Sequence, residues 1–302
     1  MKKLDIAVLM GGVSAEREVS LVSGTKAADA LESLGHTVRR IDVTRDLKQL
    51  IDDLTPAPDV CFNALHGTCG EDGVIQGILD WQELKYTHSG RLASAIAMSK
   101  PLTNQLAEAA GLDVAAHKLV LADDLLQGDL PLDFPFVVKP PAEGSSVGVH
   151  IILTEADLPA LEVLSPDEIV MVEQFIPGRE LTVAVKAGQA LGVTEIVSDR
   201  EFFDYTAKYT DGQASHYCPA QMPLDLEQKA MRQAEVMHDR LECKGLTRCD
   251  FRYDPKTERL VFLEINTQPG LTPISLAPEQ ADKLAGIDYP ALCQWMVEEA
   301  LA

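Results

Sequence analysis

Two polar side chains interrupt one short apolar run near the end of this 302-residue chain. The run LVFLEIN at 260–266 is too short for a comfortable helix, and its composition predicts a buried strand. Alternate side chains of a strand point the same way, so Glu264 and Asn266 would project together. Leu263 and Ile265 would then face the opposite layer. The run therefore predicts a carboxylate and an amide side by side on one sheet face.

A third oxygen ligand is expected from the strand-like run CDFRY at 249–253. Antiparallel pairing of the two runs would add the carboxylate of Asp250 to the same patch. An Asp, a Glu and an Asn amide are hard oxygen ligands, which suit Mg²⁺ held partly by substrate phosphates. An edge strand with solvated acids is the alternative. The turn NTQPG at 266–270, which directs backbone donors to the same place, favours the metal site.

Two loops near the N-terminus follow predicted parallel strands. The apolar run 4–10 leads through Gly11 and Gly12 into a helix, as in a βαβ unit whose helix N-terminus can receive an anion. The GxGxxG spacing is missing, so a nicotinamide enzyme is disfavoured. Glu16 near this helix start could merely complement the helix dipole. The strand 60–65 ends in HGTCGEDG, and ligand crevices open at that edge of a parallel sheet, which favours a functional His66 over a structural one.

A strand, a glycine- and serine-rich loop and a second strand are predicted in the middle of the chain. The strand 136–140 carries Lys139, and the loop EGSSVG at 143–148 precedes the next strand. Such a hairpin can lay backbone N–H groups over phosphates, although an ordinary hairpin turn is a common alternative. It is not a Walker loop, because the required lysine and the following helix are missing. Glu173 ends the strand 169–175 and could pair with an adenine amino group.

The segment 198–219 is polar and aromatic and has few aliphatic residues. A loop of that length without its own core is usually functional or disordered, and its aromatic content argues against disorder. We predict a lid that excludes water from a site. Helices are expected at 226–243, with an amphipathic pattern, and at 289–302, closing the chain.

Composition limits the classes of partner. A net charge of −21 argues against nucleic-acid and anionic-membrane partners, which need a broad basic face. No stretch is long enough to span a membrane. The six cysteines show no CxxC pair, which favours a reduced, cytoplasmic setting over a disulfide framework. A polyphosphate ligand would therefore be held by local lysines, arginines and metal ions.

Five motifs in this order resemble the D-alanine:D-alanine ligase family of ATP-grasp enzymes. They are GGxSxExExS at 11–20, HGxxGEDG at 66–73, EGSSxG at 143–148, YxxKY at 205–209 and ExNTxPGxTxxS at 264–275. The resemblance runs from the first strand to the last helix. It implies an α/β and α+β chain with an ATP-grasp fold and an N-terminal Rossmann-like parallel-sheet domain. The expected units are 1–97, a substrate domain; 98–180, the central ATP-grasp subdomain; and 181–302, the C-terminal subdomain with the metal and catalytic residues.

The resemblance also implies roles for residues at the motif positions. ATP would be held between the central and C-terminal units by Lys100, Lys139, Glu143, Ser145, Ser146, Glu173, Glu180 and Lys208. Two Mg²⁺ ions, or Mn²⁺ in their place, would be held by Asp250, Glu264 and Asn266. Residues expected to bind or activate D-alanine are Glu16, His66, Ser145, Tyr209, Arg248, Gly270, Ser275 and Leu276. Thr68 departs from the family pattern, in which this position is often basic.

The implied reaction joins two D-alanine molecules through an acyl phosphate, for peptidoglycan precursor synthesis, in the cytoplasm and as a homodimer. A carboxylate is a poor acyl donor until it takes the γ-phosphoryl group of ATP. Two alternatives stay open. One is a ligase that joins D-alanine to D-lactate, although the pair Lys208 and Tyr209 resembles the dipeptide type. The other is a catalytically silent nucleotide-binding regulator, against which the intact Arg248, Asp250, Glu264 and Asn266 argue.

Overall fold

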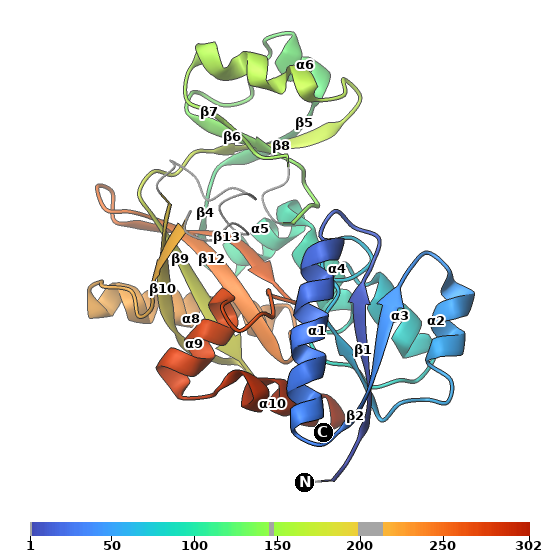
Figure 1. Cartoon of the computed structure of the whole chain (residues 1–302). Helices are drawn as coiled ribbons and strands as arrows, with labels where there is room; N and C mark the ends of the chain where they lie inside the picture. Colours follow the sequence, from blue (N-terminus) through green and yellow to red (C-terminus); the bar gives the residue numbers. More distant parts are fainter. Residues whose placement is uncertain (1, 145–147, 199–213) are drawn as a thin grey trace.

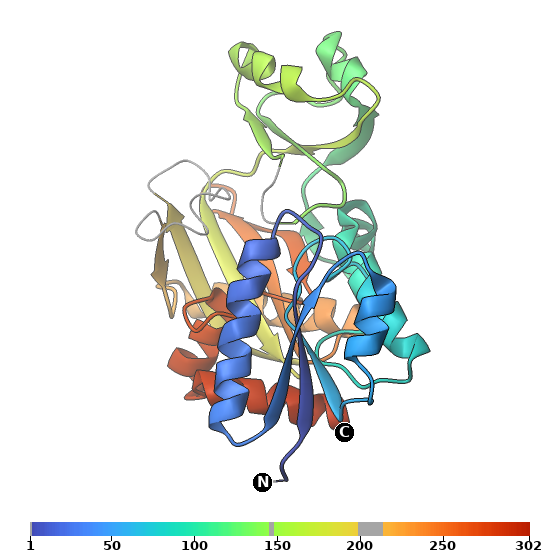
Figure 2. The ribbon, with the colours of Figure 1, turned by 45° about the vertical axis from the view of Figure 1, so that its right-hand side comes forward.

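The chain folds into three sheets with helices packed on them. This computed structural model describes residues 2–144, 148–198 and 214–302. A parallel sheet with its helices stands beside a larger sheet, and a small lobe projects above both (Figure 1). Both termini lie at the end of the molecule opposite the small lobe, as Figure 2 also shows. None of the helices in the described ranges has the length and apolar character needed to cross a membrane.

The N-terminal lobe is a βαβ unit extended by one strand. Its three parallel strands have the order β2-β1-β3. They are β1 (Asp5–Gly11), β2 (Thr37–Val43) and β3 (Val60–Asn63), with helices α1 (Arg17–Ser33), α2 (Leu47–Asp53), α3 (Val74–Trp81) and α4 (Arg91–Met98). The predicted strands and the glycine turn into α1 are confirmed. All residues of β3 are buried, which accounts for its continuous apolar run between two helical layers.

The largest sheet has six strands in the order β11-β10-β9-β12-β13-β4. Its strands are β9 (Arg179–Lys186), β10 (Gln189–Ser198), β11 (Ala214–Tyr217), β12 (Leu246–Asp254), β13 (Arg259–Asn266) and the short β4 (Asp113–Val114). Only β4 is parallel to its neighbour. The helices that accompany this sheet are α5 (Lys100–Ala109), α8 (Leu224–Arg240), α9 (Leu276–Ala285) and α10 (Tyr289–Leu301).

The small lobe is an antiparallel sheet with the order β5-β8-β6-β7. Its elements are β5 (His117–Leu121), α6 (Ala122–Leu126), β6 (Phe136–Lys139), β7 (His150–Ile152), the 3₁₀ helix η1 (Glu155–Val163) and β8 (Ile169–Gln174). The two helical segments cover the outer face of this sheet (Figure 1). The inner face is turned toward the large sheet, so the hairpin β6 and β7 overhangs the strands that carry the predicted metal ligands.

Packing between the lobes crosses the expected unit boundaries. Helix α5 and strand β4 belong to the range 98–180, yet their apolar side chains share a core with the largest sheet. A second core joins α1 to α10 at the C-terminus. The boundaries at 97/98 and 180/181 therefore remain predictions, because the apolar cores do not separate at these positions. The fold itself brackets a cleft between the small lobe and the largest sheet.

The predicted pairing of β12 with β13 is confirmed, and it contains an irregularity. Asp250 lies opposite Glu264, but the next pair is Phe251 with Phe262, so one extra residue bulges from β13. A bulge breaks the two-residue alternation of side chains. The expectation that Leu263 faces the opposite layer is therefore wrong: Leu263 lines the same pocket as Glu264. The bulge turns two consecutive side chains toward the cleft.

Candidate active site

A pocket lies between the small lobe and the largest sheet, and it continues into a smaller one toward the N-terminal lobe. The larger pocket is lined by side chains from both lobes, among them Lys100, Lys139, Glu173, Glu180, Asp250, Arg252, Leu263 and Glu264. The smaller one shares Lys100, Glu143 and Glu264 with it and adds Glu71, Gly144, Asn266 and Thr267. The predicted nucleotide and metal residues that the structure describes therefore line two adjoining pockets.

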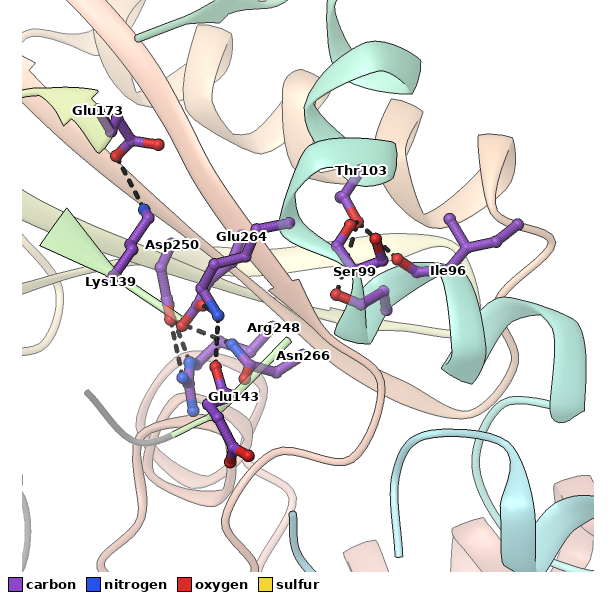
Figure 3. A network of polar contacts seen from close by, with 12 residues as sticks. Ile96, Ser99, Thr103, Lys139, Glu143, Glu173, Arg248, Asp250, Glu264 and Asn266 are labelled. Carbon is purple, nitrogen blue, oxygen red and sulfur yellow. Dashed lines mark hydrogen bonds and ion pairs between the residues drawn. The ribbon is translucent and has the colours of Figure 1, made fainter. Parts of the chain in front are cut away.

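Lys139 and Glu173 form a buried ion pair in the roof of the larger pocket. Their strands β6 and β8 are hydrogen-bonded neighbours, and Lys139 Nζ lies 2.8 Å from Glu173 Oε1 (Figure 3). Both residues are less than a tenth exposed. Removing one partner of such a pair leaves the other charge buried, which typically costs about 3–5 kcal/mol. A polyphosphate ligand would meet a lysine that the fold already holds in place.

Glu180 is held by an arginine that sequence reasoning did not single out. Arg252 pairs with Glu180 in the register of β12 and β9, and Arg252 Nη1 lies 3.4 Å from Glu180 Oε2. Arg252 Nε also donates to the carbonyl of Ile176 at 3.1 Å. Burial lowers the pKa of Arg252, and the contact with Glu180 opposes this. Arg252 lies two residues after Asp250 in the strand-like run CDFRY, and this spacing could have predicted that both side chains face the same site.

Asp250 is the centre of a hydrogen-bonded network on the floor of the pocket. Arg248 binds both of its carboxylate oxygens, at 2.9 and 2.8 Å. Asn266 Nδ2 donates to Asp250 Oδ2 at 3.1 Å, and Thr182 donates to Oδ1 at 2.7 Å. Figure 3 shows Arg248, Asp250, Glu264 and Asn266 converging. Bidentate binding by the Arg248 guanidinium group fixes the orientation of the Asp250 carboxylate and places a positive charge beside it.

The donor set at this place fits a magnesium ion. Asp250 and Glu264 lie directly opposite each other in the strand register, and the amide oxygen of Asn266 could serve as a third hard ligand. The described residues include no group of three His, Cys, Asp or Glu side chains arranged to hold a metal. A site of two carboxylates and one amide would therefore need further oxygen atoms, which substrate phosphates commonly supply at Mg²⁺ sites.

Lys100 joins the metal side of the pocket to the central loop. It begins helix α5, and its Nζ lies 3.4 Å from Glu264 Oε2 and donates to the carbonyl of Glu143. The side chain of Glu143 is itself exposed. Ser145 and Ser146, and with them Lys208 and Tyr209, lie outside the described residues. Most of the predicted lid at 198–219 does too, although β11 shows that the range includes a strand.

Glu16 and Glu71 approach each other across from the metal ligands. Glu16 is 5% exposed, and Glu71 Oε1 accepts a hydrogen bond from the backbone N–H of Gly67 at 3.0 Å. A Cβ at Gly144 would lie 3.4 Å from an oxygen of each acid, so the central loop reaches both. Burial and the neighbouring Glu16 raise the pKa of Glu71 to about 8. Sequence reasoning quoted Glu71 in its motif and gave it no role.

His66 is buried between the N-terminal lobe and the turn after β13. Its Nε2 lies 3.1 Å from Ser23 Oγ. Burial and, to a smaller extent, the positive charge of Arg248 lower its pKa to about 4, although a hydrogen bond to the backbone of Gln268 opposes both effects. At neutral pH the imidazole is therefore uncharged. It can orient a substrate through hydrogen bonds but contributes no positive charge.

The segment after β13 carries three of the predicted substrate residues and forms a compact turn leading into helix α9. Ser275 caps helix α9, and its Oγ lies 2.7 Å from Thr272 Oγ1 and accepts from the Thr272 N–H at 3.1 Å. A Cβ at Gly270 would come within 3.1 Å of the same Oγ, so glycine allows this close approach. Leu276 is the first helical residue. The predicted substrate residues Gly270, Ser275 and Leu276 thus form one short unit.

Acid should destabilise this fold through two histidines. Burial lowers the pKa of His66 and of His88 from 6.5 to about 4. The unfolded chain then binds more protons at these histidines between these values, so their contribution to stability is full above pH 6.5 and falls as the pH drops toward 4, by up to about 3 kcal/mol for each histidine. The raised pKa of Glu71 acts in the opposite direction, because the folded chain keeps a proton there that the unfolded chain releases. Denaturant unfolding at several pH values measures this slope. His88→Asn, which tolerates the positive φ of this position, should remove the contribution of His88, so that stability falls less between pH 6.5 and pH 4 than in the wild type; an unchanged slope would exclude His88 as a contributor.

The comparisons with known proteins agree with the sequence motifs. Residues 106–298, more than half of the chain, match a family model described as D-ala D-ala ligase C-terminus. The D-alanine–D-alanine ligase of Acidiphilium cryptum (strain JF-5) is 52% identical over 298 residues, which are 98% of each chain. That of Gluconobacter oxydans (strain 621H) is 51% identical over 305 residues, 99% of this chain and 100% of the relative.

Solved structures show the same likeness. The D-alanine–D-alanine ligase from Bacillus anthracis complexed with ATP has a TM-score of 0.83 and 31% identity, covering 100% of this chain and 98% of that one. The VanG D-Ala:D-Ser ligase from Enterococcus faecalis has a TM-score of 0.81 and 27% identity, covering 99% of this chain and 100% of that one. The expected ATP-grasp fold is confirmed. By sequence and by structure, this chain belongs to the D-alanine–D-alanine ligase family.

Proposed function

We propose that this protein joins two D-alanine molecules to D-alanyl-D-alanine, converting ATP to ADP and phosphate, for peptidoglycan precursor synthesis. The observation that carries the proposal is the pairing of Asp250 with Glu264 beside Arg248, opposite the buried Glu16 of the N-terminal lobe. One side of this space offers groups for phosphate and metal. The other offers a carboxylate for an ammonium group.

ATP fits the larger pocket by charge. Lys139 in the roof and Lys100 at the floor are placed to hold its phosphates, and Glu173 and Glu180 to receive the adenosine. Asp250, Glu264 and Asn266 would hold Mg²⁺, with Mn²⁺ as a substitute. The bound metal would supply positive charge to the phosphates during phosphoryl transfer.

The first chemical step activates a carboxylate. Glu16 binds the ammonium group of the first D-alanine, so that its carboxylate points toward the γ-phosphate. A carboxylate oxygen then attacks this phosphorus, the bond to ADP breaks, and an acyl phosphate forms. Lys100 and Lys139 offset the charge that spreads over the phosphoryl oxygens.

The second step forms the peptide bond. Ser275 and Leu276 bind the carboxylate of the second D-alanine, and its amine attacks the acyl carbon. The tetrahedral intermediate carries negative charge on oxygen, which Arg248 and the Gly270 N–H stabilise. Removing one such donor typically costs about 3–4 kcal/mol in the transition state. The carbon–oxygen bond to phosphate then breaks, and phosphate leaves.

The relatives favour the dipeptide over the two alternative functions. Curated relatives near 50% identity over almost the whole chain carry the name D-alanine–D-alanine ligase. The ligand set at Arg248, Asp250, Glu264 and Asn266 is intact, which argues against a silent regulator. Neither alternative is supported by a separate observation on the described residues.

A substrate panel tests the proposal directly. Phosphate release from ATP is measured with D-alanine, L-alanine, D-serine and D-lactate, and products are identified by mass spectrometry. We expect D-alanine alone to support full turnover with one dipeptide per phosphate. Faster turnover with D-alanine plus D-lactate would favour the depsipeptide ligase instead. ATP binding without any substrate-dependent phosphate release would favour the regulator.

We also propose a homodimer in the cytoplasm. All six cysteines are free, which supports a reducing compartment. Helices α3 and α4 contact each other and carry large exposed apolar side chains, including Trp81 at 86% and Leu92 at 68% exposure. Apolar side chains that lie together on the surface can mark an interaction surface, and the contact between α3 and α4 brings these two onto neighbouring helices. Sedimentation of the protein and of a Trp81→Glu variant measures the assembly, and a monomeric wild type would refute the dimer.

A further inference from the structure

Asn63 and Gln268 form a buried amide pair between the N-terminal lobe and the turn after β13. Asn63 ends strand β3 and is fully buried, and Gln268 is 2% exposed. Asn63 Nδ2 donates to Gln268 Oε1 at 2.6 Å. Gln268 Nε2 in turn donates to the carbonyl of Leu65. Two residues that are 205 positions apart in the chain thus join the two halves of the candidate site.

On the N-terminal side, the pair frames the loop that carries His66. Asn63 Nδ2 also donates to the carbonyl of Gly70 at 3.1 Å, and Asn63 Oδ1 accepts from the Leu65 N–H at 3.2 Å. Gln76 donates to the same Gly70 carbonyl at 3.0 Å. The Asn63 amide therefore hydrogen-bonds to residues at both ends of this loop, Leu65 and Gly70.

On the C-terminal side, Gln268 stands between two residues of the proposed machinery. Asn266 precedes it by two positions, and Gly270 follows it by two. Its own backbone hydrogen-bonds to the ring of His66. A weaker contact between Thr267 and Ser94 of α4, at 3.5 Å, joins the same two lobes. The amide pair is thus the main polar tie between the turn and the loop among the described residues.

Hydrogen bonds between buried amides specify position more narrowly than apolar contacts do. A buried amide left without its partner typically costs about 1–3 kcal/mol, so sliding of the turn past the loop is penalised. Apolar side chains of the same shape would tolerate such sliding. The two buried amides therefore fix the position of the turn relative to the loop more narrowly than apolar packing would.

We propose that Asn63 and Gln268 are positioning residues for peptide-bond formation, an inference that rests on the proposed function. The N-terminal lobe holds the first D-alanine through Glu16, and the segment 270–276 holds the second. The amide pair fixes the distance between these two binding regions. It thereby aligns the incoming amine with the acyl phosphate, where a displacement of about 1 Å can reduce a rate by about 100-fold.

Loss of alignment has a distinctive chemical result. In the productive step, the amine nitrogen bonds to the acyl carbon, the carbon–oxygen bond to phosphate breaks, and the nitrogen loses a proton. If the amine is displaced, a water oxygen can attack the same carbon instead. The products are then D-alanine and phosphate, so ATP is consumed without dipeptide formation. The ratio of phosphate to dipeptide reports alignment independently of overall activity.

The test substitutes Gln268→Met, which keeps the length of the side chain and removes both amide hydrogen bonds. We expect dipeptide formation to fall by about 10- to 100-fold and the phosphate-to-dipeptide ratio to rise from one to about three or more. ATP affinity should change little, because the proposed nucleotide residues Lys139 and Glu173 lie in the roof of the larger pocket, and Gln268 does not line that pocket. Gln294→Met is the matched control. Gln294 pairs with His36 at 2.7 Å and donates to Glu298 at 2.8 Å, far from the site, so its loss should lower stability and leave the ratio at one.

A double variant separates positioning from stability. Asn63→Leu combined with Gln268→Met replaces the amide pair by an apolar pair, so neither amide is left without its partner amide. The backbone groups of Leu65 still lose their side-chain partners, so the double variant should recover part of the stability lost in the single variants. A ratio that stays raised in the double variant supports positioning. The inference is overturned if the phosphate-to-dipeptide ratio returns to one in the double variant as its stability recovers. It is also overturned if this ratio never rises in Gln268→Met. A wild-type protein that makes no dipeptide refutes the proposed function and the inference with it.

Discussion

Glu264→Gln is expected to reduce dipeptide formation by about 1000-fold or more, above the ~10- to 100-fold typical of residues behind a metal ligand. In the proposed metal site, Glu264 is one of two carboxylates among three ligands, and it lies opposite Asp250 in the strand register. Glutamine keeps the shape and one oxygen but removes the negative charge that a divalent ion requires. Phosphate release under saturating ATP and D-alanine measures the effect.

Binding measurements distinguish loss of the metal from loss of the fold. Titration of the protein with Mn²⁺ in the presence of ATP should show weaker metal binding in Glu264→Gln, while thermal unfolding should change little. Glu258→Gln is the control, because Glu258 is exposed at the turn joining the same two strands, β12 and β13. Normal ATP-dependent turnover in Glu264→Gln would remove Glu264 from the metal site.

Local patterns in the sequence account for much of this site. The runs at 249–253 and 260–266 are short, apolar and interrupted by polar residues at strand spacing, so their pairing and the approach of Asp250 to Glu264 could be predicted. Lys139 could be placed at a strand end for the same reason. Such predictions succeed because strand periodicity and turn chemistry depend on neighbouring residues.

Other features depend on partners that are distant in the chain. The bulge that turns Leu263 into the pocket adds one residue to one strand, and alternation of apolar residues does not report it. The two-residue strand β4 pairs with β13 across about half of the chain. The pairing of Asn63 with Gln268 has no local signal at all, since each amide alone resembles an ordinary polar residue.

Helix α9 shows a signal that was present and unused. Ser275 caps its start, and Gly286 ends it with a positive φ, a common arrangement at helix termini. A serine before a helix and a glycine after it are local sequence signals from which both ends of α9 could be predicted. Ser275 occupies the N-cap position but makes no side-chain cap bond, and its hydroxyl is instead held by Thr272, whose backbone N–H donates to it at 3.1 Å.

Glu16→Gln should weaken binding of the first D-alanine by about 10- to 150-fold, the equivalent of the ~1.5–3 kcal/mol of a charge-assisted hydrogen bond. Glu16 is buried in the N-terminal lobe, and its oxygens lie near Gly67 and Gly144. Affinity for ATP should change little, because the proposed nucleotide contacts lie in the other two lobes. Titrations with D-alanine and with ATP measure the two effects separately.

The matched control for this prediction is Glu18→Gln, in the first turn of the same helix α1 and exposed to solvent. It removes the same charge two residues away and should leave both affinities unchanged. L-alanine should remain a poor substrate in Glu16→Gln, because an ammonium, a carboxylate and a methyl group are fixed at one carbon and the L-isomer misplaces one of them. If Glu16→Gln lost ATP affinity while keeping its dependence on D-alanine, Glu16 would belong to the nucleotide site, and the assignment of the N-terminal lobe to the first substrate would be wrong.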